Sequence, residues 1–80
     1  MTEYVWVLQR EEGRHTYQWI FATREKGYEM LRQQFDKFAD DYRCPVANIK
    51  ELADGNVMAY ASSWPQWAAK WTLYKDEVIR

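Results

Sequence analysis

Two stretches near the start of the chain are rich in β-branched and aromatic residues. Tyr4 to Arg10 (YVWVLQR) and His15 to Ala22 (HTYQWIFA) each have the composition of a β-strand. The intervening stretch, Glu11 to Arg14 (EEGR), contains a glycine and is typical of a turn. The hydrophobic pattern therefore predicts an antiparallel hairpin at the start of the chain.

The spacing of hydrophobic residues changes after Thr23. Apolar side chains then recur every three or four residues, as on one face of an α-helix: Tyr28, Leu31, Phe35, Phe38 and Tyr42. Thr23 is a suitable N-cap residue. Cys44 precedes Pro45, and a residue before proline avoids the helical region, so the helix is expected to end by Arg43.

The segment after the helix contains two further strand-like stretches. Ile49 to Leu52 predicts a short strand, and Asp54-Gly55 is typical of a hairpin turn that leads into another strand from Asn56 to Ser62. The next stretch, Ser63 to Tyr74, is compatible with two structures.

As a helix, Ser63 to Tyr74 and the residues after it would align one apolar stripe: Trp64, Trp67, Trp71, Tyr74 and Val78. As a strand that turns at Pro65-Gln66, the same residues would form a hairpin. That register pairs large residues with large residues on one face: Trp64 with Trp67, Tyr60 with Trp71 and Met58 with Leu73. We favour the strand because residues 71–74 (WTLY) have high β propensity.

These elements predict a single α+β domain over residues 1–80, with the order ββαβββ. An antiparallel sheet of four to five strands would carry one main helix packed on it. In the first hairpin, alternation points Val5 and Val7 to one face and Trp6 and Leu8 to the other, so both faces carry apolar residues. One helix covers one face only. Either the C-terminal segment covers the second face, or an aromatic patch stays exposed for a partner.

Composition excludes several classes of function. Lys and Arg number 11 and Asp and Glu number 12, for a formal net charge of −1. This balance does not favour nucleic-acid binding, which requires a basic surface. The single histidine, His15, lies beside a predicted turn, and the single cysteine, Cys44, is expected to pack as a small hydrophobe. We therefore expect no enzyme, no metal and no cofactor.

Two groups of residues are candidates for binding a partner. Glu25, Glu29, Asp36 and Asp40 recur at spacings of four, seven and four residues, which places them within about 60° of arc on the predicted helix. We call these four residues the acidic ridge. An ordinary solvated helix face would show the same pattern. The second group is Trp64 and Trp67, which flank the predicted turn at Pro65 and could insert into a pocket of a partner.

Three segments carry a resemblance to a known group of proteins: YVWVLQ, YQWIFATREKGYEMLRQQF and NVMAYASSWPQWAAKWTLYKDEVI. The chain resembles small phage and mobile-element α+β proteins of the anti-CRISPR-like kind, in which a hairpin ending in F-x-T leads into an E-K-A-like helix start. Gly27 stands where that group has alanine. The resemblance implies an inhibitor that binds a CRISPR-Cas effector and blocks DNA recruitment, and it carries over no site residue.

The expected function is therefore non-catalytic protein binding in the cytoplasm of a bacterial host. Its most concrete form is an anti-CRISPR acting on a type I CRISPR-Cas effector, with the acidic ridge as a DNA mimic that faces basic residues. One alternative is a nucleic-acid accessory protein that stacks bases on exposed aromatics with help from Lys70, Lys75 and Arg80. Another is a structural homo-oligomer that hides the second sheet face in a dimer. We expect a monomer or homodimer and no membrane association.

Overall fold

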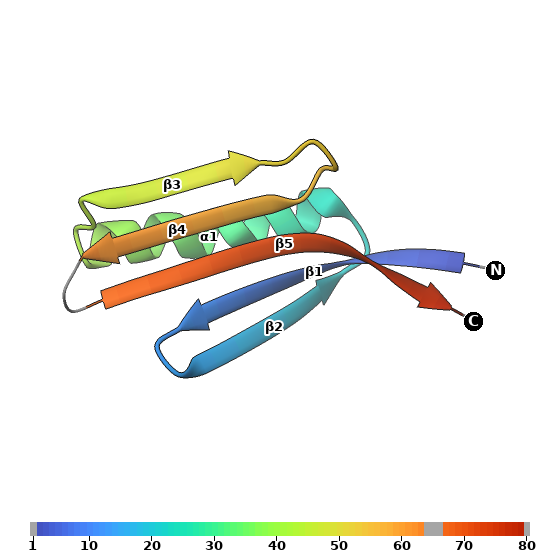
Figure 1. The fold of residues 1–80 in the computed structure, drawn as a ribbon, viewed down its shortest axis with the longest axis horizontal. Helices are drawn as coiled ribbons and strands as arrows, with labels where there is room; N and C mark the ends of the chain where they lie inside the picture. The colour runs from blue at the N-terminus through green and yellow to red at the C-terminus, as the bar shows by residue number, and fades with distance from the viewer. Residues whose placement is uncertain (1, 64–66, 80) are drawn as a thin grey trace.

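The computed structural model describes residues 2–63 and 67–79. It contains five strands and one helix in the order ββαβββ, as the sequence predicts (Figure 1). The elements are β1 (Thr2–Glu12), β2 (His15–Phe21), α1 (Arg24–Asp41), β3 (Val46–Glu51), β4 (Val57–Ser63) and β5 (Trp67–Ile79). The predicted α+β class, with one antiparallel sheet and one helix, is confirmed.

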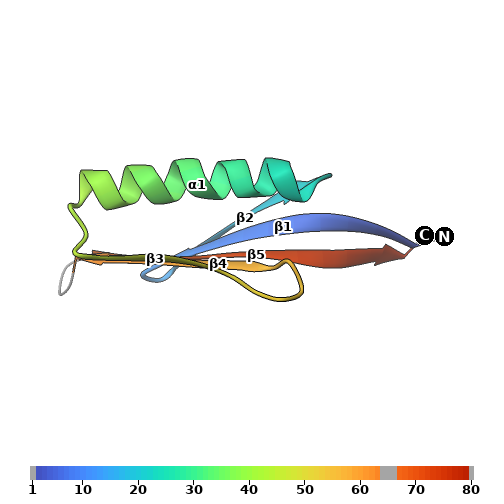
Figure 2. The ribbon, with the colours of Figure 1, turned by 90° about the horizontal axis from the view of Figure 1, so that it is seen from above.

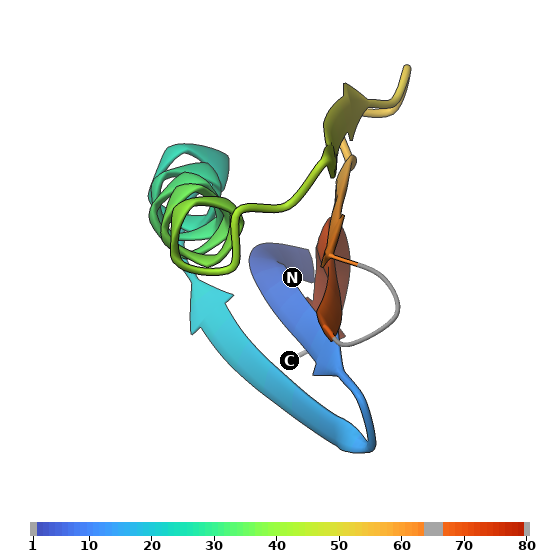
Figure 3. The ribbon, with the colours of Figure 1, turned by 90° about the vertical axis from the view of Figure 1, so that its left-hand side faces the viewer.

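The five strands form one antiparallel sheet in the order β2-β1-β5-β4-β3. The C-terminal strand β5 is therefore the central strand, paired with β1 on one side and β4 on the other. Helix α1 lies along a single face of this sheet (Figure 2), and the sheet curves around the helix when viewed end-on (Figure 3). We call the face that points away from α1 the open face.

The first hairpin turns within two residues. Glu12 pairs with His15, so only Gly13 and Arg14 connect β1 to β2. Gly13 adopts a φ of 60°, in the left-handed region that glycine enters at little steric cost. A two-residue turn of this kind fixes the pairing of the two strands and with it the face to which each side chain points.

Helix α1 begins and ends where the sequence indicates. The Thr23 side chain accepts a hydrogen bond from the Lys26 backbone N–H at 3.3 Å, which is the expected N-cap contact. After Asp41 the chain leaves the helix through Tyr42, and Arg43 takes a φ of 49°. The middle of the predicted stripe, Leu31, Phe35 and Phe38, is buried against the sheet.

The third strand and the following turn differ in detail from the expectation. β3 begins at Val46, three residues before the predicted start, and Leu52 lies in the turn instead of the strand. The Gly55 N–H donates to the Leu52 carbonyl oxygen at 3.0 Å, and Gly55 has a φ of 89°. The Asp54-Gly55 turn is therefore present as predicted, although the strand before it is longer.

The residues from Trp67 onward form a strand, as we favoured, but the predicted register was wrong by one residue. Trp71 pairs with Ala59, not with Tyr60, and Leu73 pairs with Val57, not with Met58. The predicted pair of Trp64 and Trp67 involves a residue outside the described part of the chain, and Trp67 pairs with Ser63.

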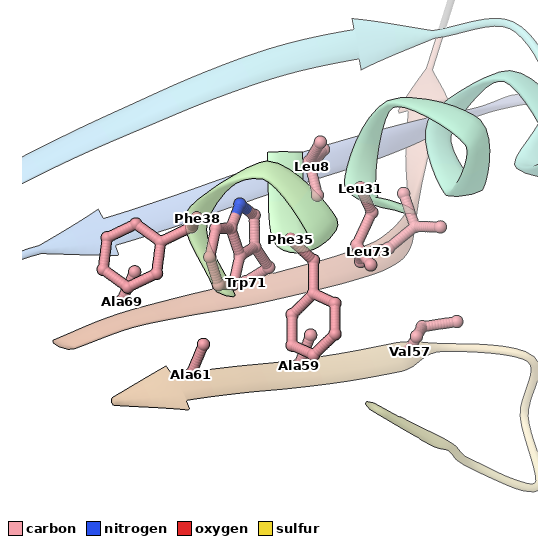
Figure 4. Packing of buried hydrophobic residues seen from close by; sticks show 10 residues of the cluster. All are labelled: Leu8, Leu31, Phe35, Phe38, Val57, Ala59, Ala61, Ala69, Trp71 and Leu73. Atoms are coloured by element: carbon pink, nitrogen blue, oxygen red, sulfur yellow. The ribbon is translucent and has the colours of Figure 1, made fainter. Parts of the chain in front are cut away.

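The register has a steric reason. Three alanines, Ala59, Ala61 and Ala69, lie on the helix-facing side of β4 and β5 and are almost fully buried. Their small side chains leave room for Trp71, which lies between Phe35 and Phe38 with ring centroids 5.7 Å from each (Figure 4). Pairing large with large, as we predicted, would overfill the layer under the helix.

A one-residue shift in register moves a strand's side chains to the other face. Trp71 is fully buried, whereas Tyr60, which was predicted to pair with it on the same face, is 43% exposed on the open face. Because the C-terminal segment is the central strand, it does not cover the open face. Of the two possibilities raised by the sequence, an uncovered second face is the one observed among the described residues.

We expect the two tryptophans of β5 to respond differently to substitution by phenylalanine. Trp71→Phe removes part of a fully buried side chain and leaves Gln34 without the indole N–H that it accepts at 3.0 Å, so the free energy of unfolding should fall by about 2 kcal/mol or more. Trp67→Phe, at a half-exposed position, should cost about 0.5 kcal/mol or less. Urea unfolding followed by circular dichroism measures both values, and equal losses would contradict this assignment of the core.

Candidate protein-binding surface

The acidic ridge lies entirely on the exposed surface of α1. Glu29 and Asp40 are exposed, and so is Asp36, which pairs with Arg32 at 3.3 Å. Glu25 occupies the first helical turn, where a carboxylate interacts favourably with the helix dipole. Over Arg24–Asp41 the helix has five acidic and four basic residues. The ridge is thus a local row of carboxylates on a nearly neutral helix.

An exposed aromatic pair lies at the C-terminal end of the same helix. The rings of Tyr42 and Trp67 stack with centroids 4.9 Å apart and an interplanar angle of 29°. They remain 36% and 47% exposed, respectively. Tyr42 also contacts the buried Phe38, with ring centroids 4.6 Å apart, which attaches the pair to the core. We call Tyr42 and Trp67 the aromatic pair.

A shallow hollow of about 240 Å³ adjoins the aromatic pair. It is lined by side chains from β1 and α1: Arg10, Gln34, Lys37, Phe38, Asp41 and Tyr42. Lys37 donates to Asp41 at 2.9 Å across this lining, and the hydrogen bond raises the pKa of Lys37. The hollow is therefore lined by charged side chains that pair with one another and by the aromatic rings of Phe38 and Tyr42.

Arg10 is the most constrained charged residue at the hollow. Its guanidinium donates to Glu12 at 2.8 Å and lies over the rings of Trp71 and Phe38, at 5.3 and 5.7 Å from their centroids. Its Nε is buried and makes no hydrogen bond within the described part of the chain. Sequence reasoning missed this residue, although strand alternation places it on the same face as Leu8, under the helix.

The side of β2 that faces α1 carries a row of aromatic side chains next to the hollow. His15, Tyr17 and Trp19 stack in sequence, with neighbouring ring centroids 6.2 Å apart. Tyr17 is opposite Arg10 in the register and is 45% exposed. The row thus extends the aromatic surface from the aromatic pair, past the hollow, to the edge of the sheet.

The structure brings together only part of the predicted site. Asp40 is two residues before Tyr42, which stacks on Trp67, so the ridge ends at the same end of the molecule as one predicted anchor but on a different side of the helix. Glu25 lies at the opposite end of α1, about 22 Å away at 1.5 Å per residue. The second predicted anchor, Trp64, lies outside the described residues.

Two other kinds of feature are absent from the described residues. Among residues 2–63 and 67–79, no three His, Cys, Asp or Glu side chains gather in a way that could hold a metal ion. In the same part of the chain, no helix is both long and apolar enough to cross a membrane. No family model, curated protein or solved structure matches the chain.

The half-buried Cys44 should react slowly with alkylating reagents. Burial raises the pKa of its thiol above the ordinary value of 9.0, so the reactive thiolate is scarce near neutral pH. The Sγ also donates a weak hydrogen bond to the Phe38 carbonyl oxygen at 3.9 Å. Iodoacetamide labelling followed by mass spectrometry should be slower in the folded chain than in urea, and its rate should still rise with pH above 9.0. Equal folded and unfolded rates would contradict this.

Proposed function

We propose that the chain is a non-catalytic protein-binding module, and the aromatic pair is the observation that carries this proposal. Tyr and Trp are enriched among residues that contribute most to protein interfaces. Tyr42 and Trp67 are exposed, yet their mutual stacking and the contact of Tyr42 with Phe38 hold them in place. Side chains that are already ordered lose little conformational entropy when a partner binds.

The most concrete form of this function is inhibition of a type I CRISPR-Cas surveillance complex. The resemblance to anti-CRISPR-like proteins supports it, as does the position of the acidic ridge on the helix that ends at the aromatic pair. In this proposal the aromatic pair supplies affinity. The ridge contacts basic residues that otherwise hold DNA. Because α1 is nearly neutral as a whole, the ridge acts at contact range and sets the orientation of the complex.

Removing Trp67 should weaken binding strongly. We expect Trp67→Ala to raise the dissociation constant for a purified type I surveillance complex by about 30-fold, the effect of losing an interface hot spot. Tyr4→Ala is the matched control, because Tyr4 is 53% exposed and lies at the opposite end of the sheet, near the chain termini. Biolayer interferometry with the immobilised complex measures both. Equal effects of the two variants would contradict the role of the aromatic pair.

Reversing charges on the ridge should relieve inhibition of DNA recruitment. Glu29→Lys with Asp40→Lys leaves the Arg32–Asp36 pair intact and places two positive charges where basic residues of the partner would lie. Glu11→Lys with Glu77→Lys makes the same change in net charge at exposed positions on β1 and β5, and leaves the Arg24–Glu51 ion pair at the start of α1 intact. In an electrophoretic mobility assay of target DNA with the surveillance complex, only the ridge variant should lose inhibition. Full inhibition by that variant would remove the ridge from the mechanism.

One observation favours a second candidate function, a nucleic-acid accessory protein. The row formed by His15, Tyr17 and Trp19 could stack bases, with Arg14 in the adjacent turn. The near-neutral charge of the chain opposes this function. Binding of a labelled single-stranded oligonucleotide at low salt that disappears in Tyr17→Ala would favour it over protein binding.

A further inference from the structure

The molecule has more surface than a compact monomer of its mass. Its accessible surface is 5802 Å² for 9.7 kDa, whereas a folded monomer of this mass has about 5,100 Å². Its radius of gyration is 13.4 Å, compared with about 12 Å for a compact domain of 80 residues. The excess is about 700 Å², and it accompanies an elongated shape with principal extents of 46, 24 and 18 Å.

The open face carries a diagonal band of apolar side chains. Directly paired residues share a face, so the register places the following residues together: Val7, Ile20, Met58, Tyr60 and Tyr74. We call these five residues the apolar band. It crosses the sheet from β2 to β4. Ile20, Met58 and Tyr60 are exposed, Tyr74 is half-buried, and Val7 is only 5% exposed beneath its neighbours. Ile20 is 70% exposed, the largest exposed fraction among the large hydrophobic side chains that the structure describes.

Polar side chains flank the apolar band on its β1–β2 side. Gln18 donates to Gln9 at 3.3 Å, and Gln9 donates to Glu11 at 3.1 Å, so these side chains hydrogen-bond to one another along the open face. An apolar centre bordered by polar groups of this kind is the usual composition of a protein interface.

We propose that a second copy of this chain covers the apolar band, in a face-to-face homodimer. Twisted sheets that pack orthogonally touch along a diagonal and separate at the other corners. A diagonal band therefore fits another twisted sheet better than a single helix or an extended peptide. The polar flank, with Gln9, Gln18 and Glu11, would lie at a separated corner and stay hydrated.

One pair of opposite charges supports a copy of the same chain as the second sheet. The twofold axis of this dimer lies between the two sheets and parallel to them, and it passes over Thr72. Its direction is midway between the direction of the strands and the direction in which the strands pair, so it exchanges the two ends of the band. It places Tyr74 of one copy over Met58 of the other and Val7 over Tyr60. The same operation brings Lys50 of one copy to Asp76 of the other, and symmetry repeats this contact. The arrangement thus matches apolar surface with apolar surface and adds one symmetric pair of opposite charges.

The dimer goes beyond the proposed function and uses a different surface. Helix α1 with its acidic ridge lies on the opposite side of the sheet (Figures 2 and 3), and the aromatic pair lies on that same side, so both stay accessible in both copies. A variant that loses self-association but still binds the partner can therefore be told apart from one that loses partner binding but still dimerises.

Solution mass tests the dimer directly. Sedimentation equilibrium of the full chain should give twice 9.7 kDa at high concentration. Ile20→Lys and Met58→Lys, both at exposed positions, should raise the dimer dissociation constant by about tenfold or more and leave the circular dichroism spectrum unchanged. Tyr17→Lys is the matched control, because Tyr17 is also exposed on β2 but points to the helix side.

A charge swap tests the docking geometry. Lys50→Asp and Asp76→Lys should each weaken dimerisation by about threefold or more, since each change puts like charges at two symmetry-related contacts. The double variant should recover the wild-type dissociation constant. A wild-type mass of 9.7 kDa at all concentrations overturns the proposal, including the case in which the band binds an unrelated protein. A dimer unaffected by Ile20→Lys and Met58→Lys also overturns it, and failure of the double variant to recover overturns the proposed axis.

Discussion

The placement of Trp71 under α1 is the constraint on which the rest of the structure depends. Its ring is fully buried on the central strand, contacts Phe35 and Phe38 edge-on, and donates its N–H to Gln34. A buried indole needs both an apolar surrounding and an acceptor for its N–H, and α1 supplies both. The indole also forms one side of the site that holds the Arg10 guanidinium. Core packing and the positioning of the hollow thus depend on one side chain.

This constraint also determines which residues remain outside. Because Trp71 must lie under α1 with alanines on the neighbouring strand, the alternate residues of β4, Met58 and Tyr60, must point to the open face. The same alternation places Trp67, four residues before Trp71, on the helix side but beyond the end of α1, where it meets Tyr42. The exposed aromatic pair and the apolar band are therefore two consequences of one strand register.

The sequence was sufficient to predict the first hairpin, the helix and the Asp54-Gly55 turn because each has a local signal, whereas β5 was favoured over a helix only by its β propensity. Thr23 caps the helix, the apolar stripe defines its buried face, and Gly13 and Gly55 mark two of the predicted turns. The register between β4 and β5 has no such signal. It depends on how much room α1 leaves above the sheet, which is a tertiary property, and reasoning from pair propensity alone matched large residues with large ones. Arg10 was not predicted as a site residue for the same reason. The role of a charged residue at a helix-facing position can be recognised only once the aromatic rings beside it are known.

The apolar band and the helix-side binding surface can act together if both copies of a dimer bind the target. Face-to-face packing would leave two helices and two aromatic pairs on opposite outer sides, related by a twofold axis. A target with repeated subunits could then engage both copies, and the second contact would form at a high effective concentration without any new interaction. A target with a single site would gain nothing from the second copy, and the dimer would serve only to cover the apolar band. Covering the apolar band would still stabilise the fold, since an 80-residue domain buries a smaller share of its surface than larger domains do and is therefore only marginally stable.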